Sequence, residues 1–239
     1  FDATKVEYIA KTIELLTTEV LDVPLIGFCG APFTIASYLI EGGPTKNYNK
    51  TRGMLISEPE IWNGLMEKLA DMSIEYLSMQ ARAGANALQI FDSWVGAVNS
   101  TEYEQAIFPH MKRIISTVKS RFPNLSLAMN GVGTDHLVST WAKLPLDVIA
   151  LDWRSSLGAA KDRGVTQTVQ GNLDPAYLYG DTKTIAKVVD EILMDGVRHG
   201  KHVFNLGHGV FPEADPAKLH WLTDYVHEKS RELWARESR

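Results

Sequence analysis

A histidine between two glycines is the feature of the sequence best suited to chemistry. His208 lies between Gly207 and Gly209, directly after an apolar run at residues 202–206 that has the length of a strand. Glycine tolerates backbone angles closed to other residues, so this turn lets a ligand approach the main chain and presents the imidazole to it. An ordinary hydrogen-bonded turn histidine fits the segment equally well, and other residues must decide between the two interpretations.

Polar and aromatic residues also follow the other predicted strands. These positions are Tyr38, Phe91, Asp92, Ser93, Trp94, Asn130, Asp152, Trp153, Arg154, Asn172 and Asp174. Polar groups and glycines at one rim of a parallel sheet are typical of the mouth of a pocket. We therefore expect Tyr38, Ser93 and His208 to converge on one cleft at the carboxyl edge of the sheet.

Each of these residues also has a purely structural interpretation. Tyr38 fits a core tyrosine with its hydroxyl satisfied, and Ser93 and Asp174 fit ordinary helix caps. Asp152 with Arg154 fits a structural ion pair. For Asp152, Arg154 and Asp174 the structural interpretation is the favoured one.

Composition and charge exclude several classes of protein. The net charge of −5 and the absence of a Lys/Arg cluster argue against a general nucleic-acid surface. Cys29 is the single cysteine, so neither an internal disulfide nor a thiolate metal site forms from cysteine alone, and a reducing cytoplasmic setting fits best. No signal peptide or membrane span is recognisable. The 239 residues predict one domain over 1–239.

Apolar periodicity predicts alternating strands and helices. Strands are expected at 23–28, 86–91, 125–129, 147–151, 168–170 and 203–206, and helices at 6–21, 57–83, 101–118, 135–143, 157–163, 182–194 and from Pro216 onward. Asp215 is the expected cap of the last helix. Capping boxes are predicted at Ser57 with Glu60 and at Thr101 with Glu104. Ile61 is expected on a buried helix face, and Pro109 is expected to break or kink its helix. A break is also expected at 42–44.

Apolar strands that alternate with helices predict an α/β fold with a parallel sheet. A dinucleotide-binding sheet would carry Gly-x-Gly-x-x-Gly, but the nearest match, Gly131-Val132-Gly133, has His136 at the third glycine position. An α/β barrel instead places its chemistry on the loops after many strands, as this sequence does. The barrel is therefore the favoured architecture.

Several segments together resemble uroporphyrinogen decarboxylase in order and spacing along essentially the whole chain. They are Leu-Ile-Gly-Phe-Cys-Gly-Ala-Pro-Phe-Thr at 25–34, Tyr-Leu-Ile-Glu-Gly-Gly at 38–43, Ala-Leu-Asp-Trp at 150–153, Gln-Gly-Asn-Leu-Asp-Pro at 170–175 and Asn-Leu-Gly-His-Gly at 205–209. The sequence departs from the family's pattern at Cys29, Phe33 and Asn130. None of these departures falls on an expected site residue.

The resemblance implies a (β/α)8 barrel, usually a homodimer, that acts in the cytoplasm in porphyrin and haem biosynthesis. Its reaction would be removal of CO2 from the four acetate side chains of uroporphyrinogen III to give coproporphyrinogen III, with no cofactor and no metal. The resemblance assigns substrate contacts to Tyr38, Ser93 and His208, with the backbone of Phe91 alongside.

The resemblance also implies that part of the machinery lies outside this sequence. The family's catalytic aspartate and its Arg-Gln-Ala-Gly-Arg segment belong to the first two barrel strands, and neither occurs here. About six strand-helix units are recognisable, whereas the barrel closes with eight strands. We expect the C-terminal two thirds of the enzyme, with open strand edges that make the isolated chain associate and leave it without measurable decarboxylation.

Three other functions remain as alternatives, and the sequence does not favour them equally. A related barrel that transfers methyl groups from cobalamin or methylated substrates would need zinc held by histidine and cysteine thiolates, and Cys29 alone cannot supply that set. A non-catalytic fragment that binds a tetrapyrrole or a partner chain is the second alternative. A hydrolase built on Ser93 is weaker, because Gly-x-Ser-x-Gly is absent.

Overall fold

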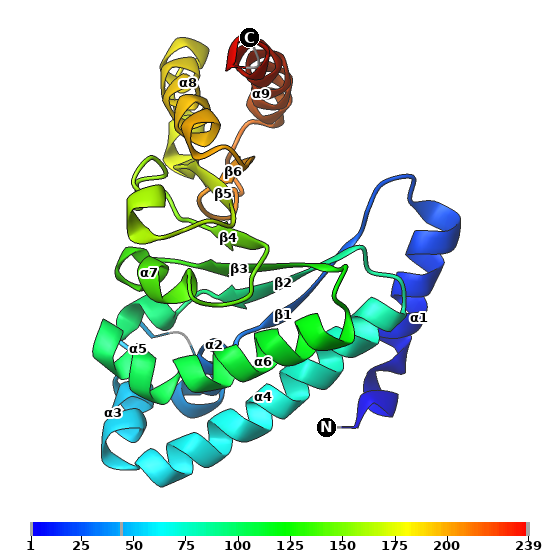
Figure 1. Cartoon of the computed structure of the whole chain (residues 1–239), viewed down its shortest axis with the longest axis vertical. Helices are drawn as coiled ribbons and strands as arrows, with labels where there is room; N and C mark the ends of the chain where they lie inside the picture. Colours follow the sequence, from blue (N-terminus) through cyan, green and yellow to red (C-terminus); the bar gives the residue numbers. More distant parts are fainter. Residues whose placement is uncertain (1, 44, 238–239) are drawn as a thin grey trace. The chain divides into compact units, whose positions relative to one another are not determined.

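The computed structural model describes residues 2–43 and 45–237, so Pro44 of the expected break at 42–44 lies outside the described residues. Strands and helices alternate along the chain (Figure 1). The strands are β1 (Ile26–Gly30), β2 (Ala87–Asp92), β3 (Ser126–Gly131), β4 (Val148–Ala150), β5 (Thr168–Leu173) and β6 (His202–Leu206). Their order in the sheet is β1-β2-β3-β4-β5-β6.

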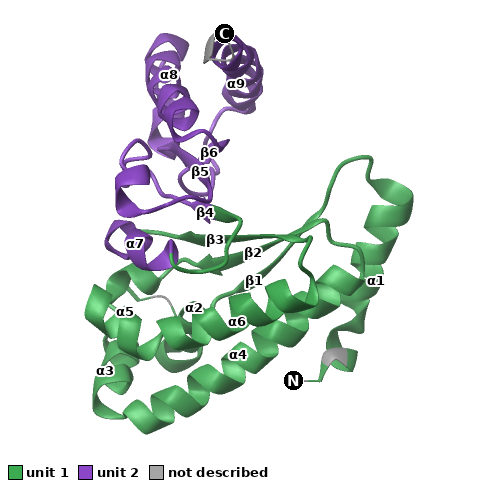
Figure 2. Cartoon of the chain, in the orientation of Figure 1, with its two compact units in different colours: residues 1–132, 143–148 green, residues 133–142, 149–239 purple. Residues whose placement is uncertain are grey.

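The α-helices vary widely in length. They are α1 (Glu7–Leu15), α2 (Pro32–Glu41), α3 (Asn49–Ser57), α4 (Pro59–Arg82), α5 (Ser100–Ala106), α6 (Phe108–Arg121), α7 (Val138–Trp141), α8 (Thr182–His199) and α9 (Pro216–Glu237). Figure 2 colours two compact units, residues 1–132 with 143–148 and residues 133–142 with 149–239. We refer to them as unit 1 and unit 2. The expectation of a single domain stays a prediction.

In unit 1, β1, β2 and β3 pair in parallel, with Cys29 opposite Ile90 and Ile90 opposite Met129. These three side chains are buried, on the face of the sheet that the helices cover. The next residues along the strands point to the other face, where Phe28 is largely exposed. The helix layer consists mainly of α4 and α6, which pack against each other, and its core includes Trp62, Met66, Met111 and Ile115.

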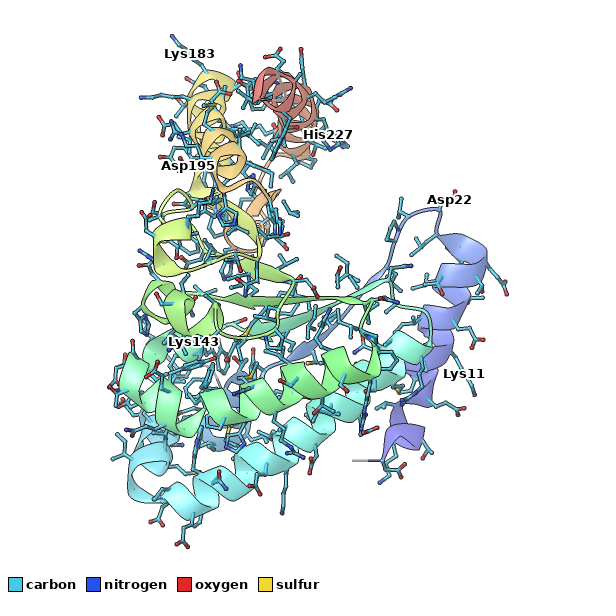
Figure 3. The ribbon with its side chains drawn as sticks, viewed as in Figure 1. Lys11, Asp22, Lys143, Lys183, Asp195 and His227 are labelled. Atoms are coloured by element: carbon cyan, nitrogen blue, oxygen red, sulfur yellow. The ribbon has the colours of Figure 1, made fainter. Side chains whose placement is uncertain are left out.

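In unit 2, β5 and β6 pair in parallel, with Leu173 opposite Leu206. Leu173 lies in a core that α8 and α9 complete with Ile185, Val189 and Leu222. Asp215 caps α9 as expected, because its Oδ1 accepts the Ala217 N–H at 2.9 Å. Of the side chains labelled in Figure 3, Lys183 on α8 and His227 on α9 are exposed, whereas Asp195 on α8 is half-buried.

Two expected capping boxes are wrong. Ser57 is the last residue of α3, and a single residue, Glu58, separates it from α4, so α4 begins at Pro59 with no side-chain cap. The box expected at Thr101 with Glu104 lies two residues earlier, at Asn99 with Glu102. Asn accepts the N-terminal amide hydrogen bonds as well as Ser or Thr does, so a search for Ser/Thr alone misses this cap.

Other expectations on the helices have mixed outcomes. The break near Pro109 is confirmed, because α5 ends at Ala106 and α6 starts at Phe108. Ile61 is exposed, and its neighbour Trp62 is buried instead. Of the helix expected at 157–163, the structure keeps one 3-10 turn, Lys161–Arg163.

The free edge of β1 is partly covered by a side chain. Ala31 donates to Phe91 O on the β2 side, so Phe28, three residues earlier, turns its backbone N–H and C=O to the opposite side. Gln80 of α4 bonds both groups, since Phe28 N donates to Gln80 Oε1 at 2.9 Å and Gln80 Nε2 donates to Phe28 O at 2.8 Å. A Cβ on Gly27 would lie 2.7 Å from Gln80 Oε1, so glycine makes room for this contact. The strand edge that was expected to be open at 23–28 therefore has its backbone N–H and C=O groups hydrogen-bonded at Phe28.

Replacing Gln80 tests this edge cover. Gln80 is 3% exposed, so Gln80→Leu leaves two backbone groups of Phe28 without their partner and should lower the free energy of unfolding by about 1–3 kcal/mol. Urea unfolding measures the change, with Gln105→Leu on the exposed face of α5 as the control. Equal effects of the two substitutions would show that the Gln80 bonds do not stabilise β1.

Candidate functional site

A buried hydrogen-bond chain joins α2 to the turn after β2. Thr34, in the first turn of α2, donates from Oγ1 to Asp92 Oδ1 at 2.9 Å. The backbone N–H of Trp94 donates to the same Thr34 hydroxyl at 3.3 Å. The helix α2 also carries Tyr38, and the turn carries Ser93. These hydrogen bonds therefore fix two expected site residues relative to each other.

Stacked aromatic rings form the second link between the same segments. The ring centroid of Trp94 lies 4.0 Å from that of Tyr38 and 5.1 Å from that of Tyr48. Tyr38 is 58% exposed, so its interpretation as a core tyrosine is wrong. Its ring packs against the residue that follows Ser93, at the carboxyl end of β2.

Ser93 and Phe91 differ in their roles in the turn. Ser93 is half-buried and caps no helix, because the 3-10 helix Val95–Ala97 has Trp94 at its N-cap without a side-chain bond. Phe91 is half-buried, contacts Phe28 edge-on with ring centroids 5.7 Å apart, and its carbonyl accepts the Ala31 N–H at 2.8 Å. The serine hydroxyl is thus free of the capping role that the sequence allowed.

Asp92 is the buried ionisable group of this turn. Its side chain is fully buried, and Oδ2 has no hydrogen-bond partner within the described residues. Burial raises the pKa of Asp92 to about 7, although the hydrogen bonds from Thr34 act in the opposite direction. Burial also raises the pKa of the Cys29 thiol to about 12. The sequence places Asp92 after a strand but gives no sign that its carboxyl group is buried.

In unit 2, His208 lies on an exposed turn beside Trp153. The two rings meet edge-on at 85°, with centroids 5.9 Å apart. A Cβ on Gly207 would lie 2.5 Å from the Trp153 N atom, which explains why the turn after β6 needs glycine there. His208 belongs to a different unit from Tyr38 and Ser93, so the expected convergence of the three on one cleft stays a prediction.

The expected ion pair of Asp152 and Arg154 is confirmed. Arg154 Nη1 lies 3.0 Å from Asp152 Oδ2, and the Arg154 N–H donates to Oδ1 at 2.9 Å. The Gly133 N–H donates to the same carboxylate. Asp174 caps a 3-10 turn, as expected, by accepting the Ala176 N–H at 2.9 Å. Asn172 also holds this loop, since its Nδ2 donates to Asp152 O and Ser155 O.

The described residues contain neither a candidate metal-binding cluster nor a candidate membrane-spanning helix. No group of three or more His, Cys, Asp or Glu side chains there could hold a metal ion. No helix among these residues is long and apolar enough to cross a membrane.

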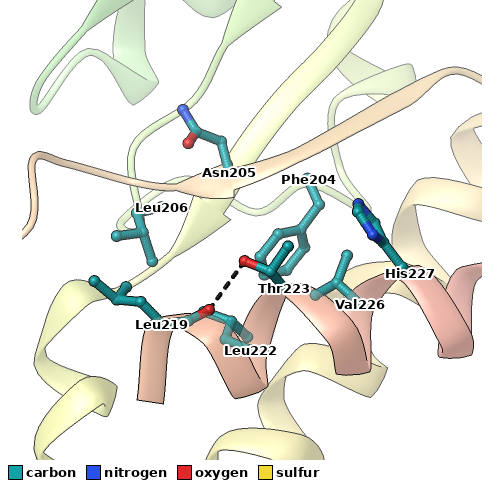
Figure 4. Close-up of a pocket in the computed structure, with 8 residues that line it drawn as sticks. All are labelled: Phe204, Asn205, Leu206, Leu219, Leu222, Thr223, Val226 and His227. Atoms are coloured by element: carbon teal, nitrogen blue, oxygen red, sulfur yellow. Dashed lines mark hydrogen bonds between the residues drawn. The ribbon is translucent and has the colours of Figure 1, made fainter. Parts of the chain in front are cut away.

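A cavity of about 230 Å³ lies between β6 and α9 (Figure 4), and none of the expected site residues lines it. It is lined by Phe204, Asn205, Leu206, Leu219, Leu222, Thr223, Val226 and His227. Thr223 Oγ1 donates to Leu219 O at 2.9 Å, an ordinary helix bond that leaves the hydroxyl without a donor role toward a ligand.

A comparison with known protein families identifies the family to which the chain belongs. The family model described as "Uroporphyrinogen decarboxylase (URO-D)" matches residues 1–229. The chain belongs to the uroporphyrinogen decarboxylase family. The resemblance stated from the sequence segments is therefore confirmed.

Curated relatives agree with this family. Proteins named uroporphyrinogen decarboxylase are 55% identical over 93% of this chain in Geobacillus sp. (strain WCH70) and 54% identical over 95% in Oceanobacillus iheyensis. The chain spans 64% and 65% of the length of these two relatives.

Solved structures support the fold. A methyltransferase from Methanosarcina mazei has a TM-score of 0.77 at 17% identity, covering 96% of this chain and 65% of that one. A B12-independent methionine synthase from Shewanella sp. W3-18-1 has a TM-score of 0.66 at 14% identity, covering 96% and 67%. At these identities the similarity concerns the fold alone. The predicted α/β class of β/α-barrel type, with six strand-helix units in the described residues, is confirmed.

The buried Asp92 predicts a pH-dependent stability. Because burial raises its pKa from the ordinary 3.8 to about 7, the folded state holds a proton that the unfolded state releases. The contribution of the group is complete below pH 4 and is lost as the pH rises toward 7. The free energy of unfolding of the wild type should therefore fall over this window relative to Asp92→Asn, by on the order of a few kcal/mol.

Chemical denaturation at a series of pH values measures this difference. Asp22→Asn, at an exposed position labelled in Figure 3, serves as the control and should follow the wild type. Parallel pH profiles for wild type and Asp92→Asn would contradict the raised pKa.

Proposed function

We propose that this chain is part of an enzyme that decarboxylates the four acetate side chains of uroporphyrinogen III to coproporphyrinogen III. The observation that carries the proposal is the family match over residues 1–229. The polar residues on the loops after β2 and β6 are consistent with it. Homodimer formation and a cytoplasmic location belong to the same proposal.

The proposed chemistry needs no cofactor, because the substrate supplies its own electron sink. A pyrrole protonated at carbon becomes a cation, and this cation takes up the electron pair released when the carboxylate leaves as CO2. The enzyme then has two tasks, which are to stabilise the cation and to hold the anionic side chains in place. The family's aspartate would perform the first task from the part of the enzyme that this sequence does not contain.

The residues of this chain would perform the second task. We assign carboxylate binding to Ser93 and His208, whose side chains can donate hydrogen bonds. Tyr38 would direct its hydroxyl to the substrate, and the backbone of Phe91 would lie alongside. The bonds from Thr34 to Asp92 and from Trp94 to Thr34 would hold the Tyr38 and Ser93 segments in register.

A zinc-dependent methyltransferase is the weaker candidate. The Methanosarcina mazei methyltransferase shares the fold, but at 17% identity it says nothing about this chain's reaction. The thiolate of Cys29 would be a necessary zinc ligand here, and burial raises the pKa of that thiol to about 12. A fragment that binds a tetrapyrrole without catalysis is the other candidate. CO2 release from uroporphyrinogen by the full-length protein separates these candidates.

Replacing His208 tests its assigned role. His208→Asn in the full-length protein should raise KM about tenfold for uroporphyrinogen while kcat changes less, because one hydrogen bond to a carboxylate is weakened. The melting temperature should stay close to that of the wild type, since His208 is exposed. His220→Asn, at an exposed position on α9, is the control.

Two results would contradict this assignment. Complete loss of activity at an unchanged melting temperature would make His208 an essential acid instead of a binding group. Unchanged kinetics would remove it from the site.

A further inference from the structure

The Arg154 side chain is fixed on two sides. On one side its Nη1 bonds to Asp152 Oδ2 at 3.0 Å, and Asp152 is 0% exposed. On the other side its guanidinium carbon lies 3.8 Å from the ring centroid of Trp153. A stacked guanidinium with a buried counter-ion has lost much of its rotamer freedom before any ligand arrives.

The rest of the guanidinium remains available to a ligand. The Arg154 side chain is 51% exposed, and among the residues that the structure describes Asp152 is its one carboxylate partner. A guanidinium carries several N–H donors in a planar fork, and the fork matches the two oxygens of a carboxylate. The exposed N–H groups can therefore donate hydrogen bonds to a second carboxylate without breaking the first pair.

His208 contacts the same indole from another loop. Its ring meets Trp153 edge-on, while the Arg154 guanidinium lies over the indole face. Gly207 packs directly on the Trp153 backbone, which holds the turn after β6 against the loop after β4. Two nitrogen donors thus flank one aromatic ring inside unit 2, on loops that follow two different strands.

We infer that Arg154, positioned by Trp153 and Asp152, binds a carboxylate of the anionic substrate next to the one bound by His208. The inference rests on the proposed function, because a substrate with several carboxylates has one for each donor. It extends that function to residues for which the sequence favoured a purely structural ion pair.

An ion pair alone does not account for this geometry. The Asp152 carboxylate already accepts the N–H groups of Gly133 and Arg154, so two backbone donors partly satisfy it. A half-exposed arginine adds little to stability through such a pair. Its planar side chain is nevertheless held in one orientation, as a carboxylate-binding group requires.

The experiment compares Arg154→Ala and Arg154→Lys with a matched control in the full-length protein. Arg198→Ala is the control, because Arg198 also pairs with an aspartate of unit 2, Asp195 at 3.1 Å, and is 70% exposed. Uroporphyrin, which carries eight carboxylates, is titrated into each variant while tryptophan fluorescence is recorded. CO2 release from uroporphyrinogen is measured in parallel, and thermal melting reports on the fold.

Arg154→Ala should weaken uroporphyrin binding about tenfold, the loss of one charge-assisted hydrogen bond at a partly exposed site. Arg154→Lys keeps a cation beside Asp152 and should fold like the wild type. It should still bind several-fold more weakly, because lysine lacks the planar fork. Arg198→Ala should bind as the wild type does.

Equal uroporphyrin affinity of Arg154→Ala, Arg154→Lys and Arg198→Ala would overturn the inference. Weakening in Arg154→Ala that Arg154→Lys restores in full would also overturn it, because charge beside Asp152 would then be sufficient. A failure of the proposed function would give a different result. The wild type would then bind uroporphyrin but release no CO2 from uroporphyrinogen.

Discussion

Parallel strand pairing is the constraint on which the rest of this structure depends. A chain that runs through β1, β2 and β3 in one direction must return by a helix each time, so the strands of a unit end at the same edge. The β5–β6 pair imposes the same constraint in unit 2. The loops at these edges are free to carry polar residues because the helices and strands already bury the apolar ones.

Each unit then uses a fully buried aspartate to hold its loops. In unit 1, Asp92 accepts from Thr34 and ties α2 to the turn that carries Ser93. In unit 2, Asp152 accepts from the backbone of Gly133 and Arg154 and from the Arg154 side chain. The two carboxyl groups differ in their partners. Burial raises the pKa of Asp92, which has no cationic partner among the described residues. Asp152 instead forms an ion pair with Arg154.

Sequence patterns predicted the parts of the fold that repeat. Six strands and the longer helices followed from apolar periodicity, and Asp215 followed from its place before Pro216. The pattern did not predict α2, which carries Tyr38, because its residues are apolar on most sides and show no clear period. It also placed Ile61 on a buried face, although the neighbouring Trp62 has the larger apolar surface and fills the core.

The sequence suggested candidate site residues, but not the contacts that hold their segments in place. Residue types after each strand pointed to Ser93 and His208, because loops at a strand's carboxyl end are recognisable from glycines and polar residues. The Thr34–Asp92 bond joins residues 58 positions apart, and no local pattern encodes such a pair. Contacts of this kind depend on the tertiary fold, which periodicity describes only coarsely.

The central claim is our proposal that Tyr38, Ser93 and His208 bind one substrate. A crystal structure of the full-length protein with coproporphyrinogen bound tests it most directly. We expect Tyr38, Ser93 and His208 around a single ligand at the carboxyl edge of the strands, with carboxylates of the ligand at Ser93 and His208. A ligand bound elsewhere, or any of the three side chains on the opposite edge of the sheet, would contradict it.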